Sequence, residues 1–414
     1  MGVATIDNTS VRDINGFADV GHPAMYGEDI WREPFEKLRR EDPVHWYEDS
    51  LYGPYWALSR YKEIMDVELN DTAFSSAQEL GGILIMDEGD LAKRKSFIRM
   101  DRPEHTLHRQ TVAPMVGPTN LENMTALIRQ RTSTVLDELP HGETFNLVDS
   151  VSIPLTTMML ATLFDFPFEE RQRLTYWSNV ATCDLNAPDP LVKTEEERTT
   201  VLQEMAARFR ELYEERAKQE PKFDLLSMLA HSDVARDMDD LTFQGTVTVL
   251  VIGGNDTTRN TMTGSVLALS QFPEQERLLR EYPELVRNLI PETIRWQTPL
   301  PHMRRTAKTD AEIGGKKIAK GDKVVMWYIS GNNDEEMFTD PYRFDITRKN
   351  VRRHLSFGAG IHRCVGDRLA ELQLNILWEE ILKRGMRFNV EGDPVRIYST
   401  VVRGYHELPV SITT

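Results

Sequence analysis

The chain has 414 residues, and its 65 acidic side chains outnumber the 49 basic ones to give a net charge of −16. A surface of this sign repels polyanions, so binding to DNA or RNA over a broad face is not expected. The hydrophobic share of 40% excludes intrinsic disorder. Two cysteines exclude a disulfide scaffold and fit a reducing, cytoplasmic compartment. The polar first 17 residues do not look like a signal peptide, and no run of 18 apolar residues predicts a membrane anchor.

The spacing of apolar residues predicts helices through most of the first 300 residues and small β regions elsewhere. A strand is expected near 52–61, where aromatic residues alternate, and hairpins are expected near 302–330, which contain Gly-Gly and the β-prone VVMWYI. Another helix is expected at 367–384, followed by strands near 388–414. Because no βαβ alternation appears, we predict a single, mainly α domain over 1–414 with small β-sheets, and a Rossmann fold is unfavoured. The other helices are expected at 30–40, 119–138, 150–164, 168–180, 195–219, 239–271 and 283–296.

A glycine-rich loop surrounds the second cysteine, Cys364, in the run FGAGIHRCVG at 357–366. Its glycines, Gly358, Gly360 and Gly366, allow the backbone to bend and to approach something flat and bulky. A strong helix is predicted to begin directly after the loop, and the N–H groups of a helix start stabilise a thiolate. On this loop alone, an inert buried thiol is an equally weighted alternative.

The run VLVIGGNDTT at 249–258 places Gly253 and Gly254 inside a predicted buried helix, where each costs roughly 1 kcal/mol relative to alanine. A ligand pressed against an opened helix backbone would justify that cost. Asp256 and Thr257 would then place an acid and an alcohol beside the opening, as a proton relay. For this segment alone, a kinked packing helix with a hydroxyl bonded to a backbone carbonyl is the favoured alternative.

Glu292 and Arg295 share one helix face, so their charges can pair. Such pairs are common on surfaces, but Trp296 and Pro299 indicate that this helix end is buried, where charges need partners.

His105 and Arg109 are four residues apart and share a helix face, so they could hold an anionic group together. A solvated basic face is the alternative. Asp101 is expected to be the N-cap of this helix, with Pro103 in the first turn.

Together these residues make the sequence resemble the cytochrome P450 family of haem-thiolate monooxygenases. The loop at 357–366 matches the family signature FGxGxHxCxG at every fixed position, and residues 254–258 match its oxygen-activation motif. Residues 292–295 match the family's ExxR motif, and 338–348 match the loop that closes a Glu–Arg–Arg network. The motifs occur in the family's order and span most of the chain. The resemblance implies the cytochrome P450 fold, an oxidoreductase that uses O2, and haem b held by a cysteine thiolate.

The resemblance also assigns roles to individual residues. Cys364 would be the axial iron ligand, and Asp256 and Thr257 would deliver protons to dioxygen and favour O–O cleavage. Cys183 matches no family motif and is expected to be an ordinary thiol. The other positions that match haem contacts are His105, Arg109, Gly253, Arg305, Phe357, Gly358, His362 and Gly366. The positions that would brace the haem loop without touching substrate are Glu292, Arg295 and Arg348.

The chain is most similar to the soluble bacterial members of the family, which receive NAD(P)H electrons through a flavin reductase and an acidic iron–sulfur ferredoxin. Between residues 348 and 368 the net charge is +5, within a chain of −16. This inversion predicts a docking site for the ferredoxin on the thiolate side of the haem. Surface solubility and salt bridges are the alternative explanation. A monomer is expected. The basic residues of this segment, called the basic cluster below, are Arg348, Lys349, Arg352, Arg353, Arg363 and Arg368.

The positions that match the family's substrate pocket are all apolar, which predicts an aliphatic substrate held by shape. Longer phrases within 240–385 resemble the bacterial alkane branch, which hydroxylates the terminal carbon of medium-chain alkanes and fatty acids. A terpenoid or steroid hydroxylase is the alternative. A non-catalytic haem sensor is a third, which the Asp256–Thr257 pair and the basic cluster disfavour. The expected pocket residues are Ile83, Leu84, Met86, Val249, Ile252, Leu300, Pro301, Val401 and Val402.

Overall fold

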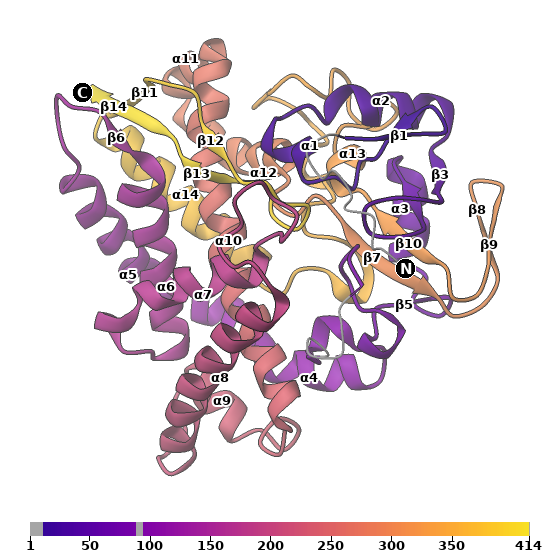
Figure 1. Ribbon diagram of the computed structural model, residues 1–414. Coiled ribbons are helices and arrows are strands. Elements are labelled where there is room, and N and C mark those ends of the chain that lie inside the picture. Colours follow the sequence, from indigo (N-terminus) through magenta and orange to yellow (C-terminus); the bar gives the residue numbers. More distant parts are fainter. Residues whose placement is uncertain (1–10, 88–93, 414) are drawn as a thin grey trace.

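The computed structural model describes residues 11–87 and 94–413, so the first ten residues of the polar N-terminal stretch lie outside it. Most of the helices gather on one side of the molecule and the largest sheet lies on the other (Figure 1). The mainly α architecture with small sheets is as predicted. The α-helices are α1 (Ala24–Gly27), α2 (Arg32–Glu41), α3 (Tyr61–Glu68), α4 (Glu104–Val112), α5 (Pro118–Asp137), α6 (Ile153–Phe164), α7 (Gln172–Thr182), α8 (Glu195–Ala217), α9 (Leu225–Ala230), α10 (Asp240–Gln271), α11 (Pro273–Glu281), α12 (Val286–Gln297), α13 (Tyr328–Gly331) and α14 (Asp367–Lys383).

The longest helix, α10, runs through the middle of the molecule and packs against α6, α7, α8 and α12. It begins where the Asp239 carboxylate accepts a hydrogen bond from the Thr242 N–H at 2.9 Å, and it ends just before Pro273. Close packing along it requires glycine, because a Cβ on Gly264 would lie 2.3 Å from Oε1 of Gln297 on α12. Helix α10 is therefore the central element against which α6, α7, α8 and α12 pack.

A five-stranded sheet has the order β3-β4-β10-β7-β5. Its centre pairs β10 parallel to β4 and antiparallel to β7, with Val325 opposite Arg304. The hairpins predicted near 302–330 are present as β7, β10 and the projecting β8–β9 pair. The strands of this region are β3 (Val44–Tyr47), β4 (Tyr55–Leu58), β5 (Phe74–Ser75), β7 (Met303–Ala307), β8 (Ala311–Ile313), β9 (Lys316–Ile318) and β10 (Lys323–Met326).

The C-terminal segment returns to the helical side, where β11-β14-β6 form a small sheet. The loop between β12 and β13 is tied to the end of α12, because the Arg403 N–H donates to the Pro299 carbonyl at 2.9 Å. The remaining strands are β1 (Asp13–Ile14), β2 (Phe17–Ala18), β6 (Phe145–Asn146), β11 (Arg387–Val390), β12 (Val395–Arg396), β13 (Tyr405–Glu407) and β14 (Pro409–Thr413).

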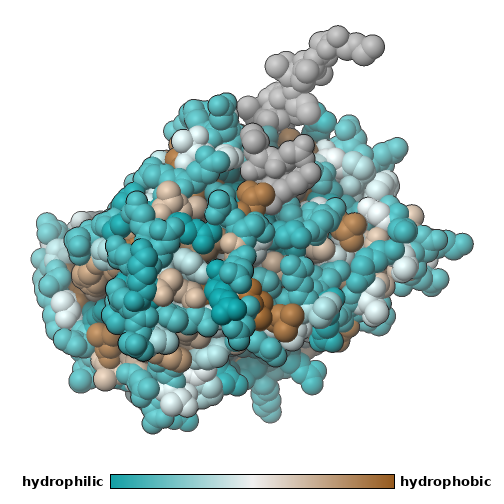
Figure 2. All heavy atoms as spheres, turned by 90° about the horizontal axis from the view of Figure 1, so that it is seen from below, coloured by the Kyte–Doolittle hydropathy of each residue, from teal (hydrophilic) through white to brown (hydrophobic). Residues whose placement is uncertain are grey.

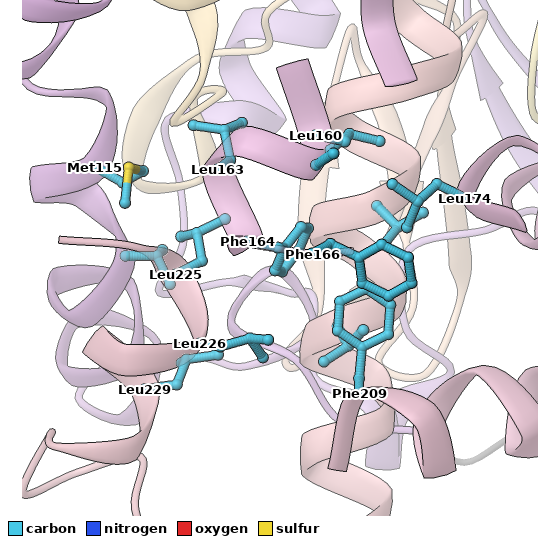
Figure 3. Close-up of a cluster of buried hydrophobic side chains, with 14 of the residues drawn as sticks. Met115, Leu160, Leu163, Phe164, Phe166, Leu174, Phe209, Leu225, Leu226 and Leu229 are labelled. Carbon is cyan, nitrogen blue, oxygen red and sulfur yellow. The ribbon is translucent and has the colours of Figure 1, made fainter. Parts of the chain in front are cut away.

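A large apolar core joins α6, α7, α8, α9 and α10. In Figure 3, Phe164, Phe166 and Phe209 form its centre, and Met115, Leu163 and Leu225 lie together on one side of it. The surface in Figure 2 is mostly hydrophilic, with scattered apolar residues. Within the described ranges, no helix is long and apolar enough to cross a bilayer.

Asp101 is not the cap that the sequence predicts. Helix α4 begins at Glu104, and no side chain caps it. The Asp101 carboxylate instead accepts hydrogen bonds from the Ser75 hydroxyl at 2.8 Å and the Ser76 N–H at 3.1 Å, and it pairs with Lys308 at 3.3 Å. The Asp101 carboxylate is therefore bound by residues distant in sequence, including the cation of Lys308, and not by the N–H groups of the helix start.

Candidate active site

A large cavity lies between α10 and the glycine-rich loop that precedes α14. It encloses about 1530 Å³ of space not filled by atoms, a figure that includes open solvent. Most of its lining is apolar, and Met115, Leu163 and Leu225 of the core in Figure 3 form part of its wall. The polar side chains that line it include Arg109, Thr257, Arg305, His362 and Cys364.

The sulfur of Cys364 opens onto this cavity. The Cys364 N–H donates to the Phe357 carbonyl at 2.8 Å, which folds the loop back on itself, and Gly358 and Gly360 both have φ of +62°. Enclosure by protein raises the pKa of the Cys364 thiol to about 11, although a hydrogen bond from the Gly366 backbone works in the opposite direction. A metal cation bound to this sulfur would lower its pKa, because a coordinating thiol is deprotonated. Cys183 lies away from this cavity, at the end of α7.

One part of the cavity presents cations and unpartnered donors. Arg109 and Arg305 line it, and the rings of His105 and His362 lie 4.4 Å apart. Both ring nitrogens of His105 and Nδ1 of His362 are buried and have no hydrogen-bond partner among the described residues. Burial lowers the pKa of His105 to about 4 and that of His362 to about 2, so both rings are neutral. Unsatisfied buried groups are costly, so this constellation fits a ligand that carries carboxylates.

Two glycines expose main-chain atoms to the cavity. A Cβ built on Gly253 of α10 or on Gly366 before α14 meets no atom within 4 Å, and both residues line the cavity. The thiol, the carboxylate-binding groups and these main-chain atoms together fit the haem that the sequence resemblance implies. Nine positions were expected at that cofactor, and all except His105 line the cavity directly: Arg109, Gly253, Arg305, Phe357, Gly358, His362, Cys364 and Gly366.

The two residues of the expected proton relay, Thr257 and Asp256, lie in different surroundings. Thr257 lines the cavity, and its hydroxyl donates to the Gly253 carbonyl at 2.9 Å, as the alternative interpretation of this segment predicted. The Asp256 carboxylate is fully buried, pairs with Arg259 of the same helix at 2.6 Å and accepts a hydrogen bond from Ser178 of α7 at 2.8 Å. Helix α10 is continuous through both glycines, so the expected opening of its backbone is not present.

Glu292, Arg295 and Arg348 form a buried ionic network behind the glycine-rich loop. Arg295 donates to both carboxylate oxygens of Glu292, at 2.7 and 2.8 Å, and Arg348 lies 3.3 Å from the same carboxylate. Arg295 also donates to the carbonyls of Asn332 and Pro341, at 2.8 and 2.9 Å. The network thereby ties α12 to the chain before and after residue 340.

The apolar side of the cavity differs in part from the prediction. Ile83, Val249 and Leu300 line it. On α10 the lining face is set by Val249, Gly253 and Thr257, which repeat every four residues, and Ile252 lies off that face. The other expected residues that are absent from the described lining are Leu84, Met86, Pro301, Val401 and Val402.

These misplacements have a structural cause. Pro301 is buried and its carbonyl accepts the Ile329 N–H at 3.1 Å, while Val402 is 1% exposed and its N–H donates to the Ser399 hydroxyl at 3.3 Å. Both segments therefore pack into protein. The wall residues that the sequence did not indicate come from segments far apart in the chain: Phe97, Ile98, Val112, Met115, Val116, Leu163, Leu225, Leu250, Pro299 and Met303.

The basic cluster is partly neutralised. Arg348 is internal, as expected from the family pattern. Arg352 is 63% exposed and pairs with Glu371 at 3.3 Å, and Arg363 is 49% exposed and pairs with Asp367 at 2.9 Å. The other exposed cations of the cluster are Lys349, Arg353 and Arg368.

Comparison with known proteins identifies relatives over nearly the whole length. The family model described as "Cytochrome P450" matches residues 86–404. Linalool 8-monooxygenase of Pseudomonas putida is 38% identical over 402 residues, which cover 95% of this chain and 98% of that protein. The methyl-branched lipid omega-hydroxylase of Mycobacterium tuberculosis is 32% identical, over 93% of this chain and 91% of its own. The structure of cytochrome P450-153 from Novosphingobium aromaticivorans superposes with a TM-score of 0.90 at 45% identity, over 95% of this chain and 99% of that one.

Proposed function

The chain belongs to the cytochrome P450 family, and from that premise we propose that it hydroxylates the terminal carbon of an aliphatic substrate, a medium-chain alkane or a fatty acid. It is a monooxygenase whose family uses O2 and haem b with a cysteine thiolate as iron ligand. The terminal position and the aliphatic substrate are the parts that we propose.

The observation that carries the proposal is the chemistry of the cavity wall. Most side chains of the wall are apolar, including Ile83, Val249, Leu300 and Met303, although Thr257, Thr258 and Thr261 also line the cavity. A substrate held by such a wall is selected by shape and by apolar area, and each buried methylene contributes about 0.8 kcal/mol. The name of one relative is consistent with this interpretation, since it is an omega-hydroxylase of methyl-branched lipids.

The residues of the site have distinct roles in the proposed reaction. Bound haem supplies the activation of dioxygen and the insertion of one oxygen atom into a C–H bond. Cys364 would hold the cofactor through its sulfur, and Arg109 and Arg305 would bind its carboxylates, although Arg305 also pairs with the buried Glu68 at 2.9 Å. The Thr257 hydroxyl, at the cavity wall, donates or accepts a proton there, and it is one residue from the buried acid Asp256.

Three probes test the substrate class. Purified holoenzyme is given n-octane, dodecanoic acid or linalool with a surrogate ferredoxin and reductase, and the oxidised products are identified. We expect 1-octanol or the ω-hydroxy acid as the main product. Hydroxylation of linalool alone would replace this proposal with the terpenoid alternative, which the 38% identity to linalool 8-monooxygenase favours. Subterminal alcohols as the main products would contradict terminal selectivity.

Members of this family receive electrons from redox partner proteins. We propose that the partner here is an acidic ferredoxin that docks on the exposed part of the basic cluster. Five exposed cations face two neighbouring carboxylates there, so the surface stays positive within an acidic chain. Attraction of this kind accelerates association and weakens as salt is added.

A further inference from the structure

Residues 81–87, called the strap here, carry Ile83 into the cavity wall. Backbone and side-chain contacts bind the strap to the large sheet. The Ile83 carbonyl accepts the Arg304 N–H at 2.8 Å, and the Ile85 N–H donates to Nε2 of His302 at 3.1 Å. Because β7 begins at Met303, the strap lies along the start of that strand and the position of Ile83 depends on these contacts.

The strap ends in a carboxylate that joins two strands. Oδ1 of Asp87 accepts a hydrogen bond from Arg304 of β7 at 2.5 Å, and Oδ2 accepts one from Lys323 of β10 at 2.8 Å. Nζ of Lys323 also donates to the Ile85 carbonyl at 3.0 Å. Two residues of the strap, Ile85 and Asp87, are therefore held by these two cations.

The two cations need this carboxylate. Arg304 and Lys323 are 5% and 7% exposed and lie on neighbouring strands. Burial lowers the pKa of Lys323, and the proximity of Arg304 lowers it further, although the bond to Asp87 opposes both effects. Two buried like charges are unfavourable without a counter-charge. Asp87 supplies that charge from a side chain that is itself two-thirds exposed, so a substitution there changes the fastening without removing a core side chain.

Arg304 also contacts the other end of the strap. A Cβ on Gly81 would lie 2.1 Å from a guanidinium nitrogen of Arg304, so only glycine allows this approach. The Arg304 side chain thus packs on Gly81, the first residue of the strap, and donates a hydrogen bond to Asp87, the last.

We propose that Asp87 is a positioning residue that sets specificity: it fastens the strap to β7 and β10 and thereby fixes Ile83 against the substrate. The fastening itself is independent of the substrate. Only its consequence for the product rests on the proposed function.

The fastening is tested by hydrogen exchange of the full-length holoenzyme, wild type against Asp87→Asn. The matched control is Asp42→Asn at the end of α2, which loses an ion pair to Lys316 at 3.1 Å and a contact with Nδ1 of His45 at 2.9 Å, neither of which involves the strap. We expect the Ile85 amide, which donates to His302, to exchange about tenfold faster in D87N and to stay unchanged in D42N, with Asp87→Glu restoring protection. Equal exchange in D87N and wild type would overturn the proposal. Should D87N not fold, Lys323→Gln, which removes one of the two cations, gives the same comparison.

The consequence for specificity is tested with n-octane as the probe. We expect D87N to lower the ratio of 1-octanol to 2-octanol several-fold while D42N and D87E keep the wild-type ratio. An unchanged ratio in a variant with faster exchange would show that the strap does not set specificity. If the wild type oxidises no octane at all, the proposed function fails, while the exchange result still decides whether Asp87 fastens the strap.

Discussion

Replacing Glu292 by glutamine removes the carboxylate that serves two buried arginines. Glu292 and Arg295 are both 0% exposed and Arg348 is 7% exposed. The same carboxylate also accepts the Asp345 N–H at 2.9 Å, so the substitution disturbs both the ionic network and the backbone that it holds.

The cost follows from leaving buried cations without a counter-charge. Removing one partner of a buried ion pair costs about 3–5 kcal/mol. Whole proteins are stable by about 5–15 kcal/mol, so E292Q should lose a large part of the total and shift the unfolding constant by about two to four orders of magnitude. The loss arises in the network behind the glycine-rich loop, so haem retention should fall along with stability.

The assay is unfolding of the holoenzyme in guanidinium chloride, followed by tryptophan fluorescence and by haem absorbance. The matched control is Glu276→Gln on α11, which breaks a pair with Arg280 at 2.7 Å near the surface and should cost about 1 kcal/mol or less. If E292Q were no less stable than E276Q, the argument that this buried network supports the fold would be refuted.

The other predictions concern protons, electrons and pH. Thr257→Ala should keep haem and substrate binding but divert reducing equivalents to peroxide, which is measured as product formed against NAD(P)H consumed. Asp256→Asn should slow turnover by about 100-fold. Normal coupling and a normal rate in both variants would place the proton relay elsewhere. Reversing the charge of Arg352 and Arg353 should raise the KM for ferredoxin and flatten its salt dependence without changing substrate affinity, and superimposable kinetics would show that the partner docks at another surface. Burial lowers the pKa of His302 to about 4, so the unfolded chain binds the proton first and stability falls as the pH drops from about 6.5 to 4. His302→Gln should flatten that slope by about 1.4 kcal/mol per pH unit, and an unaltered slope in thermal unfolding would contradict the buried neutral ring.

Sequence reasoning located the parts of the site that are contiguous in the chain. The cysteine loop and the pair Glu292–Arg295 are short runs whose spacing carries their geometry, and the cavity and the ionic network form around them. The helix of residues 240–271 was found because its apolar pattern is long. The sequence does not show which face of this helix lines the cavity, because Ile252 and Val249 are equally apolar and only packing decides which one faces it.

The rest depended on contacts between distant segments. Asp101 looked like a helix cap, but Ser75 and Lys308 compete for its carboxylate in the folded chain. Similarly, the i,i+3 spacing of Asp256 and Arg259 allows them to pair, but only the fold shows that Ser178 of α7 also holds this carboxylate away from the cavity. A residue's type and its neighbours in sequence predict what chemistry it can do, while the tertiary fold decides toward which partner it points.

The measurement that tests this account most directly compares the two cysteines. The central claim is that the Cys364 sulfur, at the cavity between α10 and α14, is the protein ligand of the haem. Cys364→Ala and Cys183→Ala are purified with haem, reduced and exposed to carbon monoxide, and the absorption spectra of the adducts are recorded. The account predicts that C183A keeps the spectrum typical of thiolate ligation and its hydroxylase activity, whereas C364A loses both. A thiolate-type spectrum in C364A would contradict the account.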